Sequence, residues 1–157
     1  MDIDIEKFGE VVARGEELYK AFSPVHCPYL ESNVHFNAGG LEHLKFKRPR
    51  YARSRMDQYM RFKLLPLAPE ILRLSRTVQG IWETRHFERV RMHSRTDTVL
   101  KPVTYYEFVA VIKYARIKIV VKQIDGGQNF FWSIIPFWGL NKKTRRRKLY
   151  GGNPEED

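Results

Sequence analysis

The chain has one cysteine, no long apolar run and fewer acidic than basic residues, and each shortage excludes a class of protein. Because Cys27 is the only cysteine, no intramolecular disulfide can form, and a zinc site built from several thiolates is excluded. We interpret Cys27 as a small buried hydrophobic residue. The longest apolar runs are far short of the roughly 18 to 20 residues that a membrane helix needs. The acidic start MDIDIEKFGE shows no signal-peptide pattern, so we expect a cytoplasmic protein.

The motifs of several large enzyme classes are also missing. The chain contains no GxSxG nucleophile elbow, no Walker loop and no GxGxxG dinucleotide motif. Its glycine pairs at 39–40 and 126–127 indicate turns. The acidic residues lie mainly in the N-terminal segment and the tail, whereas magnesium-dependent phosphodiester chemistry needs clustered carboxylates. We therefore expect no metal site and no small-molecule cofactor.

Positive charge is what the chain has in excess. Its 28 lysines and arginines against 18 acidic residues give a formal charge of +10 and a pI near 9.8. Such an excess favours polyanions, first nucleic acid and second an acidic membrane or protein surface. A basic protein whose charge only keeps it in solution is the alternative. The 157 residues, 43% of them hydrophobic, suffice for one folded domain with a real core.

The first half of the chain mixes helical and extended patterns. Apolar residues at helical spacing predict a helix over residues 4–22, which Asp4 caps and Pro24 ends. Residues 30–36 predict a short strand that the glycines of NAGG end. GLEHLKF then begins either a helical turn or a second extended piece. RPRYARSR is expected to form an exposed loop or the start of a helix. Two helices follow from residue 57, with a break near the prolines of 66–69 and helical spacing continuing to residue 82.

After residue 84 the apolar spacing becomes alternating. Three strand-like pieces rich in Val, Ile, Tyr and Phe follow at 104–112, 116–124 and 129–135. IDGGQ predicts a tight hairpin between the last two. YAR between the first two fits either a turn or one long bent strand. We expect a single α+β domain over 1–140, with helices packed on a C-terminal antiparallel sheet, and a flexible tail over 141–157 that is basic and then acidic.

The available residue types favour metal-free cleavage of RNA. In that reaction the 2′-hydroxyl of the RNA attacks the neighbouring phosphorus. The protein supplies a base, an acid for the leaving 5′-oxygen, and donors for the extra negative charge of the transition state. Histidine, lysine, arginine, serine and tyrosine suffice, and the chain is rich in them.

Four segments follow one another in the middle of the chain: VHFNAGGLEHLKFK at 34–47, YMRFKLLPLAPEIL at 59–72, YYEFVAVIKYARIKIVVKQI at 105–124 and FFWSIIP at 130–136. Their order and motifs resemble the metal-independent ribonuclease toxins of the barnase/EndoU/colicin/RelE-like superfamily, specifically its phage-associated branch. The resemblance covers residues 30–138, and the insert RPRYARSR departs from the family pattern. It implies a RelE- or barnase-like fold, a toxin of a toxin–antitoxin or phage-associated system, and an acidic antitoxin or immunity partner.

Four residues are candidates for this chemistry. We choose His43 as general acid/base, because histidine titrates near neutral pH and nearby cations favour its neutral form; a surface histidine on a basic loop fits the sequence equally well. Lys45 and Arg61 are candidate cations for the phosphate, Arg61 because its planar fork matches a phosphate. A solvated charge is the alternative for Lys45. Ser133 is a candidate hydrogen-bond donor, and it can share a cleft with Trp132 only if the strand is bulged or twisted.

Other basic residues are candidates for RNA contact, and they lie around RPRYARSR and in the tail: Lys47, Arg48, Arg50, Arg53, Arg55, Lys142, Lys143, Arg145, Arg146 and Arg147. Such contacts give an affinity that falls as salt rises. Two alternatives to an endoribonuclease stay open. One is a nucleic-acid-binding protein without catalysis, and the other is an adapter whose charge binds an acidic protein.

Overall fold

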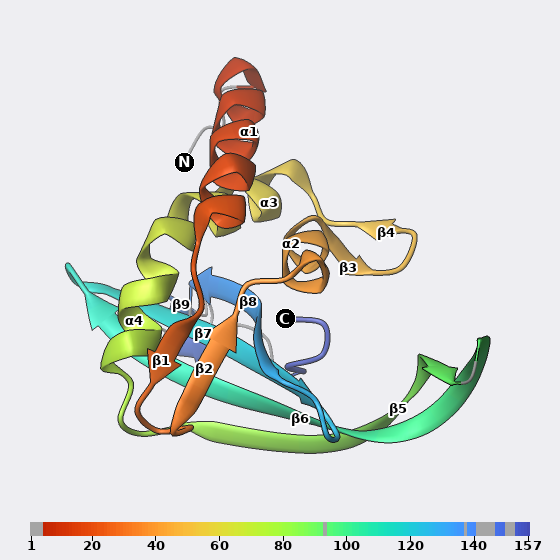
Figure 1. Ribbon diagram of the computed structural model, residues 1–157. Coiled ribbons are helices and arrows are strands. Elements are labelled where there is room, and N and C mark those ends of the chain that lie inside the picture. Colours follow the sequence, from red (N-terminus) through yellow and green to blue (C-terminus); the bar gives the residue numbers. More distant parts are fainter. Residues whose placement is uncertain (1–4, 93, 137, 141–146, 150–152) are drawn as a thin grey trace.

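The computed structural model describes residues 5–92, 94–136, 138–140, 147–149 and 153–157. It confirms the predicted α+β class: helices from the first half of the chain pack on a mostly antiparallel sheet (Figure 1). The helices are α1 (Ile5–Ala21), α2 (Ala38–Lys45), α3 (Arg55–Leu64), the 3-10 turn η1 (Leu65–Leu67) and α4 (Ala68–Leu74). The predicted N-cap Asp4 lies outside the described residues.

Strands from both halves of the chain form the main sheet. Its order is β1-β2-β8-β7-β6-β5, and every pair is antiparallel except β2 with β8. The strands are β1 (Val25–Cys27), β2 (Ser32–His35), β5 (Gly80–Met92), β6 (Arg95–Ile112), β7 (Ala115–Ile124) and β8 (Asn129–Pro136). The sheet is therefore not wholly C-terminal, because β1 and β2 extend it beyond β8. Two small hairpins, β3 (Phe46–Arg48) with β4 (Tyr51–Ala52) and β9 (Trp138–Leu140) with β10 (Arg147–Leu149), complete the strands of the described ranges.

The two faces of this sheet differ in chemistry. We call one the helical face, because α1, α3 and α4 cover it with their apolar side chains. Its sheet residues are Phe108, Ile117, Ile119, Val121, Phe131 and Ile134. We call the other the polar face. Its buried residues on the central strands include Val103, Tyr105, Lys118, Val120, Lys122 and Ser133. Alternation of side chains along each strand separates the two sets.

Two tight turns set the register of the central strands. The open question at YAR is decided in favour of a turn: Ile112 pairs with Ala115, and Lys113 and Tyr114 between them have φ angles of 47° and 68°. Two positive φ angles in a row match the right-handed twist of a hairpin. The predicted IDGGQ hairpin joins β7 to β8, with Gly126 at φ 74°.

One helix was predicted to be longer than it is in the structure. We expected helix up to residue 82, but α4 ends at Leu74, where Ser75 turns extended and its hydroxyl donates to the main-chain oxygen of Ile71 (2.6 Å). Ile81 and Trp82 instead lie in β5, opposite β6. Pairing with a long neighbouring strand overrides a helical period carried by few residues. None of the helices in the described ranges is long and apolar enough to cross a membrane.

Candidate anion-binding site

Helix α2 carries His43 onto strand β8. The side chain of Asn37 caps the helix by accepting from the main-chain nitrogen of Gly40 (3.1 Å). Only glycine fits at position 40, because a Cβ there would lie 2.2 Å from the main-chain oxygen of Phe131. This close approach stacks the His43 ring on the Trp132 indole, with centroids 3.9 Å apart. GLEHLK is thus helical, and His43, 3% exposed, is not a surface residue.

Arg53 holds His43 in this position. Its Nε donates to the main-chain oxygen of His43 (2.9 Å), and its Nη2 lies 3.0 Å from Nε2 of the His43 ring. A guanidinium only donates, so Nε2 accepts and the neutral ring carries its proton on Nδ1. We expected Arg53 in an exposed loop, but it is 8% exposed. The reason is that its Nη1 turns inward to Asp57 (3.4 Å), and its Nη2 also donates to the main-chain oxygen of Glu156 (2.8 Å).

A bulge in β8 brings Trp132 and Ser133 to the same face of the sheet. Val120 pairs with Ser133 and Val121 with Phe131, so the register skips Trp132. In a regular strand these two neighbours would point to opposite faces, and one extra residue removes that constraint. Trp132 Nε1 donates to the main-chain oxygen of Glu155 (3.1 Å), which places it beside Ser133 under the same chain segment.

Arg61 reaches this face from α3 and meets Ser133. Its Nε donates to Asp57 (2.6 Å), and its Nη1 donates both to the Ser133 hydroxyl and to the main-chain oxygen of Asp157. Ser133 Oγ donates to the same Asp157 oxygen at 2.8 Å, and Arg53 Nη2 lies 3.4 Å from it. Two predicted residues, Arg61 and Ser133, therefore converge with Arg53 on a single oxygen atom.

Two lysines of β7 belong to the site but were not predicted from the sequence. Lys118 Nζ lies 2.8 Å from the Asp157 carboxylate and 2.9 Å from that of Glu107. Lys122 Nζ lies 4.2 Å from the centre of the Trp132 ring. The signal was present in IKIVVKQI: two lysines four residues apart share one face of a mostly apolar strand. We call the side chains of Arg53, Arg61, Lys118 and Ser133 the donor cluster.

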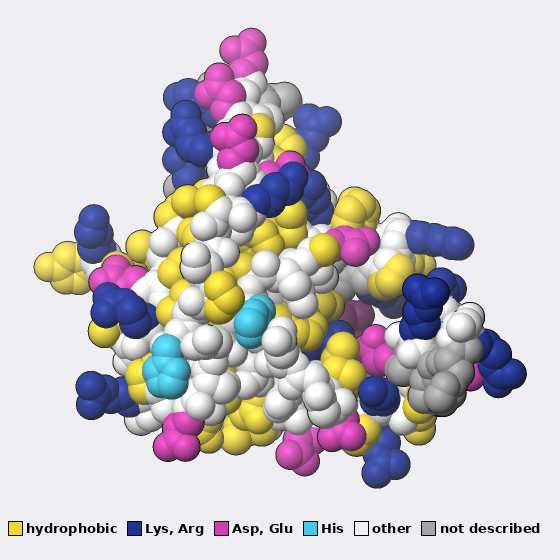
Figure 2. Space-filling model, viewed as in Figure 1, with side chains coloured by type: hydrophobic (Ala, Val, Ile, Leu, Met, Phe, Trp, Pro, Cys, Tyr) yellow, Lys and Arg dark blue, Asp and Glu magenta, His cyan; other side chains and the backbone are white. Residues whose placement is uncertain are grey.

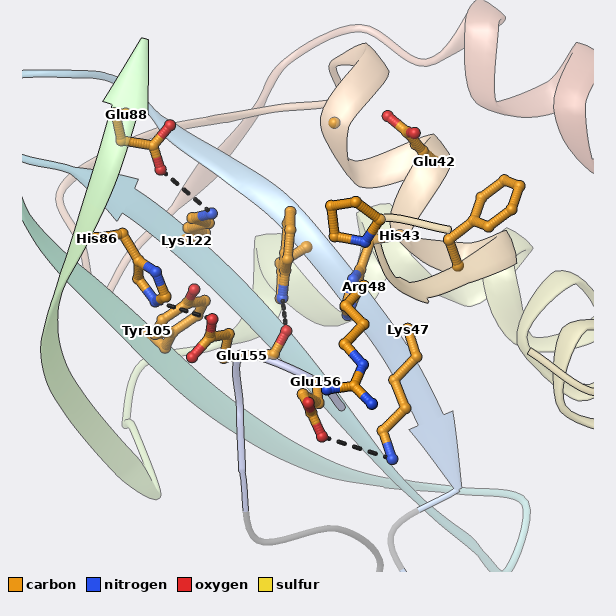
Figure 3. Close-up of a pocket in the computed structure, with 14 residues that line it drawn as sticks. Glu42, His43, Lys47, Arg48, His86, Glu88, Tyr105, Lys122, Glu155 and Glu156 are labelled. Atoms are coloured by element: carbon orange, nitrogen blue, oxygen red, sulfur yellow. Dashed lines mark hydrogen bonds and ion pairs between the residues drawn. The ribbon is translucent and has the colours of Figure 1, made fainter. Parts of the chain in front are cut away.

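A cavity of about 430 Å³ opens beside the donor cluster (Figure 3). His43, Trp132 and Lys122 line one part of it, and the labelled residues Glu155 and Glu156 border another. The Tyr105 hydroxyl is buried in its wall and has no hydrogen-bond partner among the described residues. Lysine and arginine side chains stand near the β3–β4 hairpin and the free end of the β5–β6 hairpin (Figure 2). The cavity is thus large enough for a ligand, and its lining mixes the cations Lys47, Arg48 and Lys122 with four glutamates.

Burial sets the protonation states around the cavity. Burial first, and the charges of Arg53 and Arg61 next, lower the pKa of His43 from 6.5 to about 2. Nearby cations thus act in the predicted direction, and the ring is neutral at neutral pH. Burial and Arg61 lower the pKa of Arg53 to about 10, against the opposing effect of Asp57. Burial also lowers the pKa of Lys122. A lysine of lowered pKa is a better proton donor than an ordinary one.

Of the other residues predicted for the site, some line the cavity and some lie away from it. Lys45 makes an ion pair with Glu16 of α1, so it is not brought to the donor cluster. Lys47 and Arg48 line the cavity, and Lys47 Nζ lies 3.5 Å from Glu156. The two remaining arginines of this region, Arg50 and Arg55, are exposed.

The predicted tail is described only in part. Lys142, Lys143, Arg145 and Arg146 lie outside the described residues, and Arg147 begins β10. The segment Asn153–Asp157, which we expected to belong to a flexible tail, packs against the donor cluster instead. Complementary charge explains the difference, since this acidic segment meets buried cations.

No family model matches this chain, and neither a curated protein nor a solved structure does. Within the described ranges, no three or more His, Cys, Asp and Glu side chains are grouped so that they could hold a metal ion.

Proposed function

We propose that the chain is a metal-independent endoribonuclease that binds the scissile phosphate of RNA in the donor cluster. The observation that supports this most is the convergence of Arg53, Arg61 and Ser133 on one oxygen atom. Donors fixed around one oxygen are what a phosphate and its more negatively charged transition state require. A forked guanidinium and a hydroxyl supply this without a metal ion.

The proposed reaction is transesterification. The 2′-oxygen of the RNA bonds to phosphorus, the bond from phosphorus to the 5′-oxygen breaks, and a 2′,3′-cyclic phosphate and a 5′-hydroxyl result. Nε2 of His43 accepts the 2′-hydroxyl proton after Arg53 Nη2, which lies 3.0 Å from it in this structure, has moved to the phosphate. The Lys122 ammonium donates a proton to the leaving oxygen. Both residues line the cavity next to the donor cluster.

The four segments of the family resemblance support the wider proposal. They contribute α3, β7 and β8, which carry Arg61, Lys118 and Ser133 of the donor cluster, whereas Arg53 lies in the insert RPRYARSR. We accordingly propose a RelE- or barnase-like arrangement and a toxin of a toxin–antitoxin or phage-associated system, acting in the cytoplasm. An acidic antitoxin or immunity protein is the partner that such a basic site would require.

One observation favours a second candidate function, RNA binding without cleavage. A base whose pKa lies near 2 takes up protons poorly at neutral pH, since an effective general base titrates near the working pH. In this second function the same donor cluster binds a phosphate, and His43 only positions Arg53. The two candidates therefore share a ligand and differ in whether the RNA is cut.

The test is RNA cleavage in excess EDTA. Full-length protein is incubated with mixed RNA beside Arg61→Lys, which keeps the charge and loses the fork, and beside Ser133→Ala. We expect cyclic-phosphate products from the native chain and a loss of about 100-fold in rate in each variant, as for removal of one transition-state donor. The control is Arg73→Lys, because Arg73 is exposed on α4 and pairs only loosely with Glu70 (3.8 Å).

Each outcome selects a function. Intact RNA with the native chain and with Asp157→Lys, together with salt-dependent binding, would select the second candidate. Full cleavage by Arg61→Lys and Ser133→Ala would remove the donor cluster from the mechanism. Cleavage unaffected by His43→Gln would remove only the role of His43 as the base.

A further inference from the structure

The acidic segment Asn153–Asp157 lies in the place where the proposed function puts RNA. Figure 1 shows this end of the chain beneath α2, on the polar face of the sheet. Figure 3 shows Glu155 pointing to His86 and Glu156 pointing to Lys47 across the cavity. The corresponding distances are 3.0 Å and 3.5 Å. One short segment therefore spans both walls.

Asp157 uses the donor cluster as a bound anion would. Its main-chain oxygen accepts from Arg61 and from Ser133 (2.8 Å), and its carboxylate accepts from Lys118 (2.8 Å). The preceding residues add two main-chain contacts: Arg53 Nη2 donates to the Glu156 oxygen (2.8 Å) and Trp132 Nε1 to the Glu155 oxygen (3.1 Å). The segment thus accepts a hydrogen bond from every member of the donor cluster.

The contacts also close the site. Arg61, Lys118 and Ser133 keep only 2%, 2% and 0% of their surface exposed with the segment in place, and Asp157 itself is 8% exposed. A phosphate of RNA needs contact with these same atoms. The segment and an RNA phosphate cannot bind there at the same time.

Charge explains why the segment stays. Beneath Asp157 the cluster brings together the cations Arg53, Arg61 and Lys118 with the carboxylates Asp57 and Glu107. A buried cation is costly unless carboxylates lie close to it. The Asp157 carboxylate adds such a group, 2.8 Å from Lys118 Nζ.

We propose that the donor cluster is a binding site for an acidic peptide, that Asn153–Asp157 is its ligand within the same chain, and that this segment must leave before RNA can bind. The inference rests on the proposed function for the identity of the competing ligand, an RNA phosphate. When a tethered segment occupies the site, the apparent affinity of the competitor equals its intrinsic affinity multiplied by the fraction of molecules that are open. The free cluster would also accept an acidic segment of a second protein.

The test displaces the segment in the full chain by charge reversal. In Asp157→Lys, the new ammonium would lie against Lys118 and Arg61, so repulsion expels the segment. The control Glu10→Lys makes the same charge change at an exposed position of α1. Binding is measured with a 2′-deoxy oligonucleotide, which cannot be cleaved by the proposed route, and cleavage is measured with RNA in EDTA. We expect about tenfold tighter binding and faster cleavage for Asp157→Lys alone, as when about 10% of native molecules are open.

A peptide supplies the complementary arm. The peptide NPEED, added to Asp157→Lys at about millimolar concentration to match a tethered segment, should reverse the gain, and NPQQN should not. Equal binding and equal cleavage by Asp157→Lys and Glu10→Lys would overturn the inference while leaving the nuclease in place. Tighter binding by Asp157→Lys without any cleavage would support the inference and overturn the nuclease. A gain that NPEED fails to reverse would contradict the role of the peptide as a ligand.

Discussion

The two faces of one strand, β7, show how differently the same sheet is used. Toward the helices, β7 buries Ile117, Ile119 and Val121 in the hydrophobic core. Toward the other side it buries Lys118 and Lys122, and Lys118 is 2% exposed. Apolar burial stabilises the fold directly, whereas a buried ion pair is often no better than a hydrophobic replacement. The helical face therefore holds the domain together. The buried charge of the polar face is explained better by ligand binding than by a contribution to stability.

The largest contrast is expected between neighbouring residues of β8 that belong to different faces. Phe131→Ala removes a fully buried ring from the helical face and should lower the free energy of unfolding by about 3–5 kcal/mol. Ser133→Ala removes one hydroxyl from the polar face and should lower it by about 1 kcal/mol. Urea denaturation measures both. Equal losses would show that the polar face is structural to the same degree as the core.

A smaller contrast is expected between two adjacent glycines of α2. Gly40→Ala would force a Cβ against the main chain of β8 and should destabilise the protein by about 1–3 kcal/mol and displace His43. Gly39→Ala is the matched control, because its nearest side-chain neighbour is 3.4 Å away and alanine favours a helix. Thermal unfolding and the fluorescence of Trp132, on which His43 stacks, report the two effects. A stable Gly40→Ala with unchanged fluorescence would contradict the close packing of α2 on β8.

The pH dependence of stability separates the two faces in another way. The folded pKa of His43, about 2, lies below its unfolded value of 6.5, so the folded protein resists protonation. The stability that neutral His43 contributes is complete above pH 6.5 and is lost as the pH falls, with a slope of up to about 1.4 kcal/mol per pH unit. His43→Gln should reduce this slope between pH 6.5 and 5, as measured by urea denaturation at each pH. Parallel pH profiles for the two proteins would contradict a buried neutral histidine.

The smallest effect is expected at the rim of the polar face. Arg48 is exposed, lines the cavity, and lies with its guanidinium carbon 4.0 Å from the centre of the Tyr51 ring. Arg48→Gln should weaken RNA binding slightly and lower the slope of log affinity against log salt by about 0.7, as for one lost phosphate contact to single-stranded RNA. Arg14→Gln on α1 should change neither, and equal effects of the two variants would show that the rim does not contact RNA.

The sequence was sufficient for the α+β class and for the hairpin at IDGGQ, because alternation and glycine turns are local signals. It was not sufficient at residues 75–82, where the end of α4 and the start of β5 depend on pairing with β6. The strand predicted over residues 30–36 is β2, but the sequence revealed neither β1 nor the pairing of β2 with β8, which is distant in the chain.

The candidate site was predictable where residue type alone is informative. Arg61 and Ser133 were named from the sequence, and they meet on the polar face. Lys45 was named for its proximity to His43, but α2 turns it toward α1, where it pairs with Glu16. The bulge at Trp132 and the docking of Asp157 rest on long-range contacts, which no local pattern contains.

The most direct test of the central claim is a crystal structure of Asp157→Lys with a 2′-deoxy oligonucleotide. The account predicts a phosphate within hydrogen-bond distance of Arg61 Nη1 and Ser133 Oγ, in the place of the Asp157 oxygen, with residues 153–157 displaced. An oligonucleotide bound on another surface, with the donor cluster still filled by residues 153–157, would contradict it.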